Sequence, residues 1–211
     1  MITFKQFLGE ESTDEFSEFI HRECQPFIDK AKGSGVAIRG MDQPGRVIHT
    51  YNTPQAHPLH VHINTVRKDR KSLSTPDVYH RAIDGWMQDE FGIAARTGSV
   101  FVFGERSAHH TENYGQPYII FPRGDFKFLW SPVVGDLYDA LIMEFGPAFK
   151  MGRTDEVSPE DITRYVKSLQ YTDEDFNLAL QSGNEIMIEC DEYYAIPMNA
   201  ETMAYMEEVL A

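Results

Sequence analysis

The chain has little cysteine and no long apolar run. Its two cysteines, Cys24 and Cys190, stand far apart, which argues against a disulfide framework or a closely spaced metal-binding pair. No segment approaches the roughly 20 apolar residues that cross a bilayer, and the N-terminus lacks the basic-then-apolar layout of a signal peptide. We therefore expect a cytoplasmic protein with buried thiols and no membrane partner.

Basic residues are also scarce. The 19 Lys and Arg against 33 Asp and Glu give the 211 residues a formal net charge of -14. Such a surface repels nucleic-acid phosphates at long range, so a nucleic-acid partner requires a local basic patch. The acidic residues are scattered over predicted helix faces and form no single block. A non-enzymatic acidic binding or inhibitor protein therefore remains an alternative to an enzyme.

Hydrophobic periodicity and helix-end signals predict a single α+β domain that spans residues 1–211. We divide it into an N-terminal helical segment (1–35), a core (36–197) and a C-terminal helix (198–211). Within these parts we expect helices at 11–32, 74–92, 136–141, 158–169 and 172–181 and a helical link at 107–114. We expect strands at 36–41, 57–67, 99–104, 118–122, 126–131, 185–190 and 193–197, with an irregular excursion over 42–58. Pro26 should kink the first helix.

Glu185 stands out because of what precedes it. Gly183 predicts a helix stop, and Ile186 and Ile188 then alternate with more polar neighbours, as in a strand with one buried face. A carboxylate at the mouth of a strand, facing a cleft, can stabilise positive charge that develops on a substrate. The alternative is an ordinary solvent-facing strand residue.

Three stretches in this order resemble the NAD-dependent ADP-ribosyltransferases of the Arg-Ser-Glu class. They are Ile38-Arg39-Gly40-Met41 after the first helix, the strand Ser99–Phe103 with a link that ends in Asn113-Tyr114-Gly115, and Gly183-Asn184-Glu185-Ile186-Met187-Ile188. The resemblance implies a split, mostly antiparallel β-core that forms an NAD-binding cleft flanked by helices. It also implies mono-ADP-ribosyl transfer from NAD to a macromolecular acceptor, as in toxins or phage factors of host takeover.

The resemblance assigns a role to each matching residue. Arg39, beside Gly40, would anchor NAD, Ser99 would support the site, and Glu185 would be the catalytic residue. Phe101 and Tyr114 would contact the nicotinamide ring. The separate basic cluster at 67–71 contains Arg67 and Arg70. These two arginines either bind the NAD pyrophosphate, bind a nucleic-acid phosphate, or lie in a solvated loop.

This chain departs from the family pattern at two places, and the second departure bears on which acceptor is modified. The hydroxyl-rich strand is represented only by Thr97-Gly98-Ser99, with glycine in the middle. Arginine-modifying members carry a second glutamate two residues before the catalytic one, where this chain has Gly183. We therefore expect an acceptor other than protein arginine, in protein or nucleic acid. The sequence carries no signal for an oligomeric state.

The histidines supply a different hypothesis. His60 and His62 share one face of a predicted strand, and His57, His109 and His110 are possible companions. Two histidines at this spacing are typical of a cupin-like metal site. No acidic third ligand stands at a convincing spacing, so the principal hypothesis includes no metal, and the histidines are otherwise surface or capping residues.

Overall fold

A computed structural model describes residues 10–52, 58–71, 74–151 and 157–210. Its centre is an eight-stranded sheet in which every neighbouring pair is antiparallel. The strands follow one another across the sheet in this order: β2 (Arg46–Asn52), β3 (Pro58–Thr65), β8 (Glu192–Pro197), β5 (Gln116–Pro122), β1 (Ala37–Met41), β4 (Ser99–Gly104), β7 (Glu185–Glu189) and β6 (Lys127–Trp130). The predicted α+β class is confirmed.

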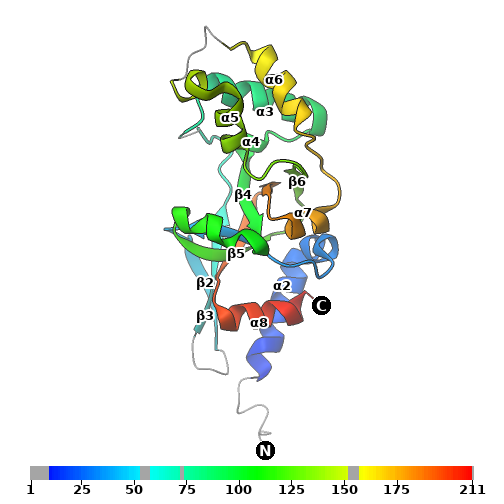
Figure 1. The fold of residues 1–211 in the computed structure, drawn as a ribbon. Helices are drawn as coiled ribbons and strands as arrows, with labels where there is room; N and C mark the ends of the chain where they lie inside the picture. Colours follow the sequence, from blue (N-terminus) through cyan, green and yellow to red (C-terminus); the bar gives the residue numbers. More distant parts are fainter. Residues whose placement is uncertain (1–9, 53–57, 72–73, 152–156, 211) are drawn as a thin grey trace, which may run out of the picture.

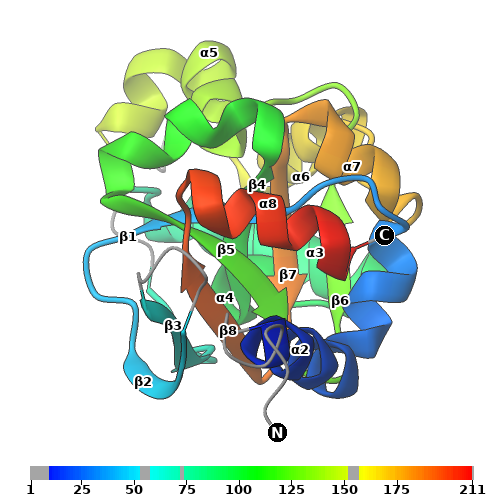
Figure 2. The ribbon, with the colours of Figure 1, turned by 90° about the horizontal axis from the view of Figure 1, so that it is seen from below.

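Helices cover the sheet in two groups (Figure 1). One group lies with the larger hydrophobic core and contains α2 (Glu10–Ala31), α7 (Phe176–Ser182) and α8 (Ala200–Val209). The other builds a second core from α3 (Asp77–Phe91), α5 (Leu137–Lys150) and α6 (Pro159–Ser168). Figure 2 shows α8 and α2 in front of the strands on one side of the molecule. The short α4 (Ala95–Gly98) leads into β4, and the 3-10 helix η1 (Glu105–Tyr114) follows it.

The strand β7 is buried on both faces, contrary to the single buried face that its sequence pattern predicts. Ile186 and Ile188 belong to the core with α2 and α7. Met187, between them, is also fully buried and belongs to the core with α3, α5 and α6. The prediction failed because methionine in an alternating pattern does not reveal that a second helical layer covers that face.

The strand β2 lies in the segment for which we predicted an irregular excursion. It pairs with β3 along its length, with a bulge between Val47 and His49. The rings of His49 and Tyr51 lie 4.8 and 6.3 Å from the ring of Phe19 on α2. Because β2 is an edge strand that is mostly exposed, few of its residues must be apolar, and the flanking prolines concealed it.

The local end signals are accurate at two other points. The backbone of α2 leaves helical geometry at Cys24, two residues before Pro26, which confirms the predicted kink. Ser158 and Asp161 form a capping box at the start of α6. Within the described part of the chain, no helix combines the length and the apolar character that a bilayer crossing requires.

The seam between β1 and β4 is short, and this opening positions the site. Their register contains only Ala37 opposite Gly104 and Ile38 opposite Phe103. By contrast, β1 pairs with β5 through Met41, and β4 pairs with β7 from Ser99 onward. Beyond the seam, no strand among the described residues pairs with the β1 side of β4, and a pocket lies there.

Candidate active site

A cavity of about 280 Å³ lies between the open part of the β1–β4 seam, η1 and the helices of the second core. Six residues that the sequence singled out line it: Arg39, Gly40, Arg70, Phe101, Tyr114 and Glu185. They come from β1, the chain before α3, β4, η1 and β7. The fold therefore gathers side chains that are widely separated in the sequence.

Glu185 is held rigidly at the start of β7. The preceding helix α7 ends at Gly183, which has a left-handed φ of +77°. The side chain of Asn184 donates to the carbonyl of Ser131 at 2.8 Å, and the backbone N–H of Glu185 donates to the carbonyl of Gly135 at 2.7 Å. Glu185 lies opposite Phe103 in the register with β4. Its position is thus fixed from two sides.

The Glu185 side chain is only 11% exposed, and this burial raises its pKa to about 7. The guanidinium of Arg96 opposes that rise, while the nearby Asp136 adds to it. A carboxyl group with this pKa is about half ionised at neutral pH. It can therefore exist as an anion although its side chain is largely enclosed, where its field on a developing cation is strong.

Arg39 and Arg70 are tethered to the open side of β4. Arg39 Nη1 donates to the carbonyl oxygen of Phe101 at 2.8 Å, and Arg70 Nη1 donates to the carbonyl oxygen of Ser99 at 3.4 Å. Burial, together with the charges of Arg39 and Arg96, lowers the pKa of Arg70 to about 10, so it remains protonated at neutral pH. Each guanidinium has five N–H donors, so both retain donors for an anionic ligand.

Arg96 is a member of the site that the sequence pattern did not reveal. It lines the pocket from α4, and its Nη1 lies 4.0 Å from Oε1 of Glu185. Its guanidinium carbon lies 5.1 Å from the ring centroid of Phe101, and that of Arg70 lies 4.5 Å from the same centroid. Phe101 therefore holds two guanidinium groups by cation–π contact.

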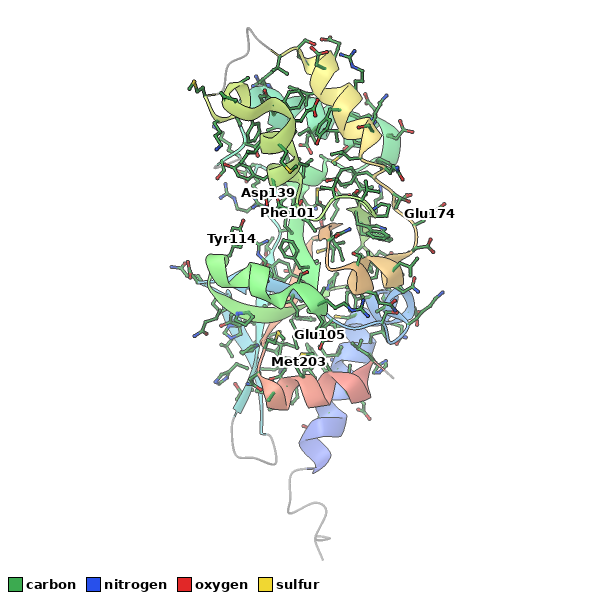
Figure 3. The ribbon with its side chains drawn as sticks, viewed as in Figure 1. Phe101, Glu105, Tyr114, Asp139, Glu174 and Met203 are labelled. Atoms are coloured by element: carbon green, nitrogen blue, oxygen red, sulfur yellow. The ribbon has the colours of Figure 1, made fainter. Side chains whose placement is uncertain are left out.

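Tyr114 ends η1 at the mouth of the pocket and is 62% exposed. Figure 3 shows it with Phe101 from β4 and Asp139 from α5 on the same side of the molecule. A Cβ on Gly40 would overlap the carbonyl oxygen of Thr111 and lie 2.9 Å from Cβ of Tyr114. Gly40 thus lets η1 pack against β1, which sets the position of Tyr114.

Ser99 and Arg67 do not line the pocket. Ser99 is buried, and its Oγ has no hydrogen-bond partner among the described residues, although its carbonyl receives Arg70. The Arg67 side chain is 72% exposed and pairs with Asp69 at 3.3 Å. The basic cluster at 67–71 therefore divides between a surface ion pair and a pocket arginine.

Other lining residues also escaped the sequence reasoning, among them His80, Asp136 and Tyr138. Asp136 was visible only as the first residue of a predicted helix, where it accepts from the backbone N–H of Asp139. The signal available for Arg96 was its position three residues before the serine strand. A short helical turn between a helix and a strand has no pattern that distinguishes a pocket arginine from a surface one.

The histidine hypothesis gains no geometric support. The rings of His60 and His62 lie 6.4 Å apart. Their ring nitrogens contact Thr50 Oγ1 and the carbonyl of Gly45, respectively. Among the described residues, no three His, Cys, Asp or Glu side chains gather where they could hold a metal. His57 and the side chains of His109 and His110 lie outside the described residues.

Comparisons with protein-family models, with curated proteins and with solved structures find no match for this chain. The functional argument therefore depends on the pocket and its residues.

Proposed function

We propose that this chain binds NAD in the pocket and transfers its ADP-ribose to a macromolecular acceptor. The observation that carries the proposal is that Arg39 and Glu185, far apart in the sequence, line the same cavity. An anion anchor and a buried carboxylate are the two groups that this reaction requires at one site. The short β1–β4 seam, beside which the pocket lies, supports this proposal.

The charges of the pocket suit a dinucleotide. Arg39 and Arg70 present guanidinium groups whose planar donors match phosphate oxygens. The exposed ring of Tyr114 at the mouth provides an aromatic face for nicotinamide. The cavity is close to the lower end of the range for small-molecule sites, about 300–1,000 Å³. It therefore accommodates the reacting part of NAD, while the adenosine part extends past the mouth.

The transfer breaks the bond between nicotinamide and ribose. Nicotinamide leaves as a neutral molecule with the bonding electron pair, and the ribose carbon acquires oxocarbenium character. The Glu185 carboxylate stabilises this cation electrostatically, an effect commonly worth 10²–10³-fold in rate, on the order of 3–4 kcal/mol. The acceptor then forms a bond to the same carbon and releases its proton. Rigid placement of Glu185 means that little reorganisation is needed as charge develops.

The turn before Glu185 bears on which class of acceptor is modified. Position 183, two residues earlier, is a glycine with a left-handed backbone, and a Cβ there would contact Ser107 Oγ too closely. A glutamate at this position would therefore have a strained backbone. We propose an acceptor other than the arginine side chain, on protein or nucleic acid.

The test is incubation of the purified protein with isotope-labelled NAD and separate protein, RNA and DNA fractions. We expect label in one fraction with wild type and at least about a hundredfold less with Glu185→Gln. Glu189→Gln, at the other end of β7 and outside the pocket lining, is the matched control and should label at the wild-type rate. Equal labelling by wild type and Glu185→Gln, or no labelling of any fraction by wild type, would contradict the proposal.

A further inference from the structure

The Ser99 hydroxyl is not placed to support Glu185. It is buried, has no hydrogen-bond partner among the described residues and does not line the pocket. Glu185 lies opposite Phe103 in the β4–β7 register, whereas Ser99 lies opposite Glu189. The serine and the glutamate thus occupy opposite ends of two paired strands. A side chain that positions the Glu185 carboxylate must therefore come from elsewhere in the pocket.

Arg96 is the charged group whose position matches that role. Its Nη1 lies 4.0 Å from Oε1 of Glu185, an oxygen that is buried without a hydrogen-bond partner among the described residues. Both side chains are nearly enclosed, 10% and 11% exposed. An ion pair in such surroundings is weakly screened by solvent, so it acts strongly on the carboxylate.

Arg96 is itself fixed by three contacts. Its backbone N–H donates to Oδ1 of Asp84 at 2.7 Å, and its Nη2 donates to Oγ1 of Thr75 at 3.0 Å. Its guanidinium lies over the ring of Phe101. These contacts come from α3, from the chain before α3 and from β4. The side chain is therefore oriented before any ligand binds.

We propose that Arg96 is the positioning residue that holds the Glu185 carboxylate, in the role for which the family motif predicts Ser99. This inference rests on the proposed function, because it concerns the residue that makes Glu185 usable for catalysis. Arg96 acts by favouring the ionised form of Glu185 and by aiming its buried oxygen. The positive charge of Arg96 also opposes the effect of the nearby Asp136 on Glu185.

Several charged or titratable groups surround Glu185, so the contribution of Arg96 must be separated from theirs. They are Arg96 on α4, Asp136 at the start of α5, Arg70 before α3, Arg39 on β1, Tyr114 on η1 and Tyr171 before α7. Arg96 is the largest of the cationic influences, and it opposes the effect of burial. Removing it leaves burial and Asp136 dominant, which favours the protonated carboxyl group.

The experiment measures the Glu185 titration directly, without NAD. The protein is labelled with carbon-13 at the glutamate carboxyl groups, and Glu185→Gln identifies the Glu185 signal. We expect a midpoint near pH 7 in wild type and an upward shift of about 1–3 pH units in Arg96→Met. Arg96→Lys should stay closer to wild type because it keeps the charge. Ser99→Ala should leave the midpoint unchanged.

Kinetics provide the second readout. At pH 7 the smaller ionised fraction should lower kcat/KM of Arg96→Met at least about fivefold, and raising the pH should recover part of the loss. A purely structural role would give a loss that pH does not relieve. Arg81→Met, on the exposed face of α3, is the matched control and should behave as wild type.

The outcomes separate the two proposals. An unchanged Glu185 midpoint in a folded Arg96→Met, or a shift in Ser99→Ala, would overturn the role of Arg96. If Arg96→Met does not fold, Arg96→Gln replaces it under the same criteria. If the midpoints shift as expected but wild type neither binds nor cleaves NAD, the transferase proposal fails while the control of Glu185 ionisation stands.

Discussion

Replacing Glu185 by glutamine should make the protein more stable at alkaline pH while it removes turnover. Burial raises the Glu185 pKa from 4.5 to about 7 in the folded protein. The folded state therefore holds the proton more tightly than the unfolded chain. The stabilisation by this protonated group is fully present below about pH 4.5 and is lost as the pH rises through 7. Glutamine has a similar shape and does not titrate, so it escapes that loss.

The expected size follows from the pKa difference. A shift of about 2.5 units at 1.36 kcal/mol per unit corresponds to about 3 kcal/mol between the protonated and ionised extremes. The free energy of unfolding of Glu185→Gln should therefore exceed that of wild type by about 3 kcal/mol at pH 8. At pH 5 the excess should shrink to about 1 kcal/mol, since Glu185 is then protonated in most folded wild-type molecules.

Urea unfolding of both proteins at pH 5 and pH 8 measures this difference, with Glu189→Gln as the control on the same strand. If Glu185→Gln is no more stable than wild type at pH 8, or if its advantage does not depend on pH, the raised pKa of the buried Glu185 is refuted. A stabilised but inactive variant would show that this position is kept for function at a cost in stability.

Three further predictions concern the same pocket. The kcat/KM for NAD cleavage should rise with pH through about 7 and then level off, because the ionised Glu185 is the active form; a flat profile from pH 5 to 9 would contradict this. Arg39→Ala should raise the NAD dissociation constant at least about tenfold in calorimetry and should also lower thermal stability, because the Phe101 carbonyl loses its donor. Arg123→Ala, at a surface ion pair away from the pocket, should leave the NAD dissociation constant unchanged. Gly40→Ala should lower the free energy of unfolding by about 1–3 kcal/mol and weaken NAD binding, because its Cβ would displace the Thr111 carbonyl and with it Tyr114. If thermal unfolding shows wild-type stability, η1 can move away from β1 without an energetic penalty, and this prediction is contradicted.

Local patterns were sufficient for much of the fold. Helix ends with strong caps, such as Ser158 in α6 and Gly92 after α3, lie where the sequence predicts them. The turn from Gly183 to Glu185 was recognisable because a change of period follows a glycine. These features depend on neighbours along the chain, so the sequence alone could reveal them.

The rest depends on which strands become neighbours. The sheet order places β1 between β5 and β4, and β7 beside β4, although these strands are remote in sequence. That order places Glu185 opposite Phe103 and Ser99 at the far end of β4, while α4 brings Arg96 to within 4.0 Å of Glu185. The family pattern proposed the serine as the supporting residue, but a motif names residue types and not the groups that a particular fold brings within 4 Å.

The short seam between β1 and β4 explains how arginines can gather here in a protein of charge -14. Where pairing stops, alternate carbonyls of β4 have no partner strand, and a buried carbonyl needs a donor. Arg39 donates to the Phe101 carbonyl and Arg70 to the Ser99 carbonyl, so both guanidinium groups occupy the place of a missing strand. Their mutual repulsion is offset by these carbonyl dipoles and by the Phe101 ring. The ring of Phe101 contacts the guanidinium groups of Arg70 and Arg96, and the nicotinamide contact that the resemblance implies for it stays a prediction. In our proposal Tyr114, whose ring is exposed at the mouth, also contacts nicotinamide.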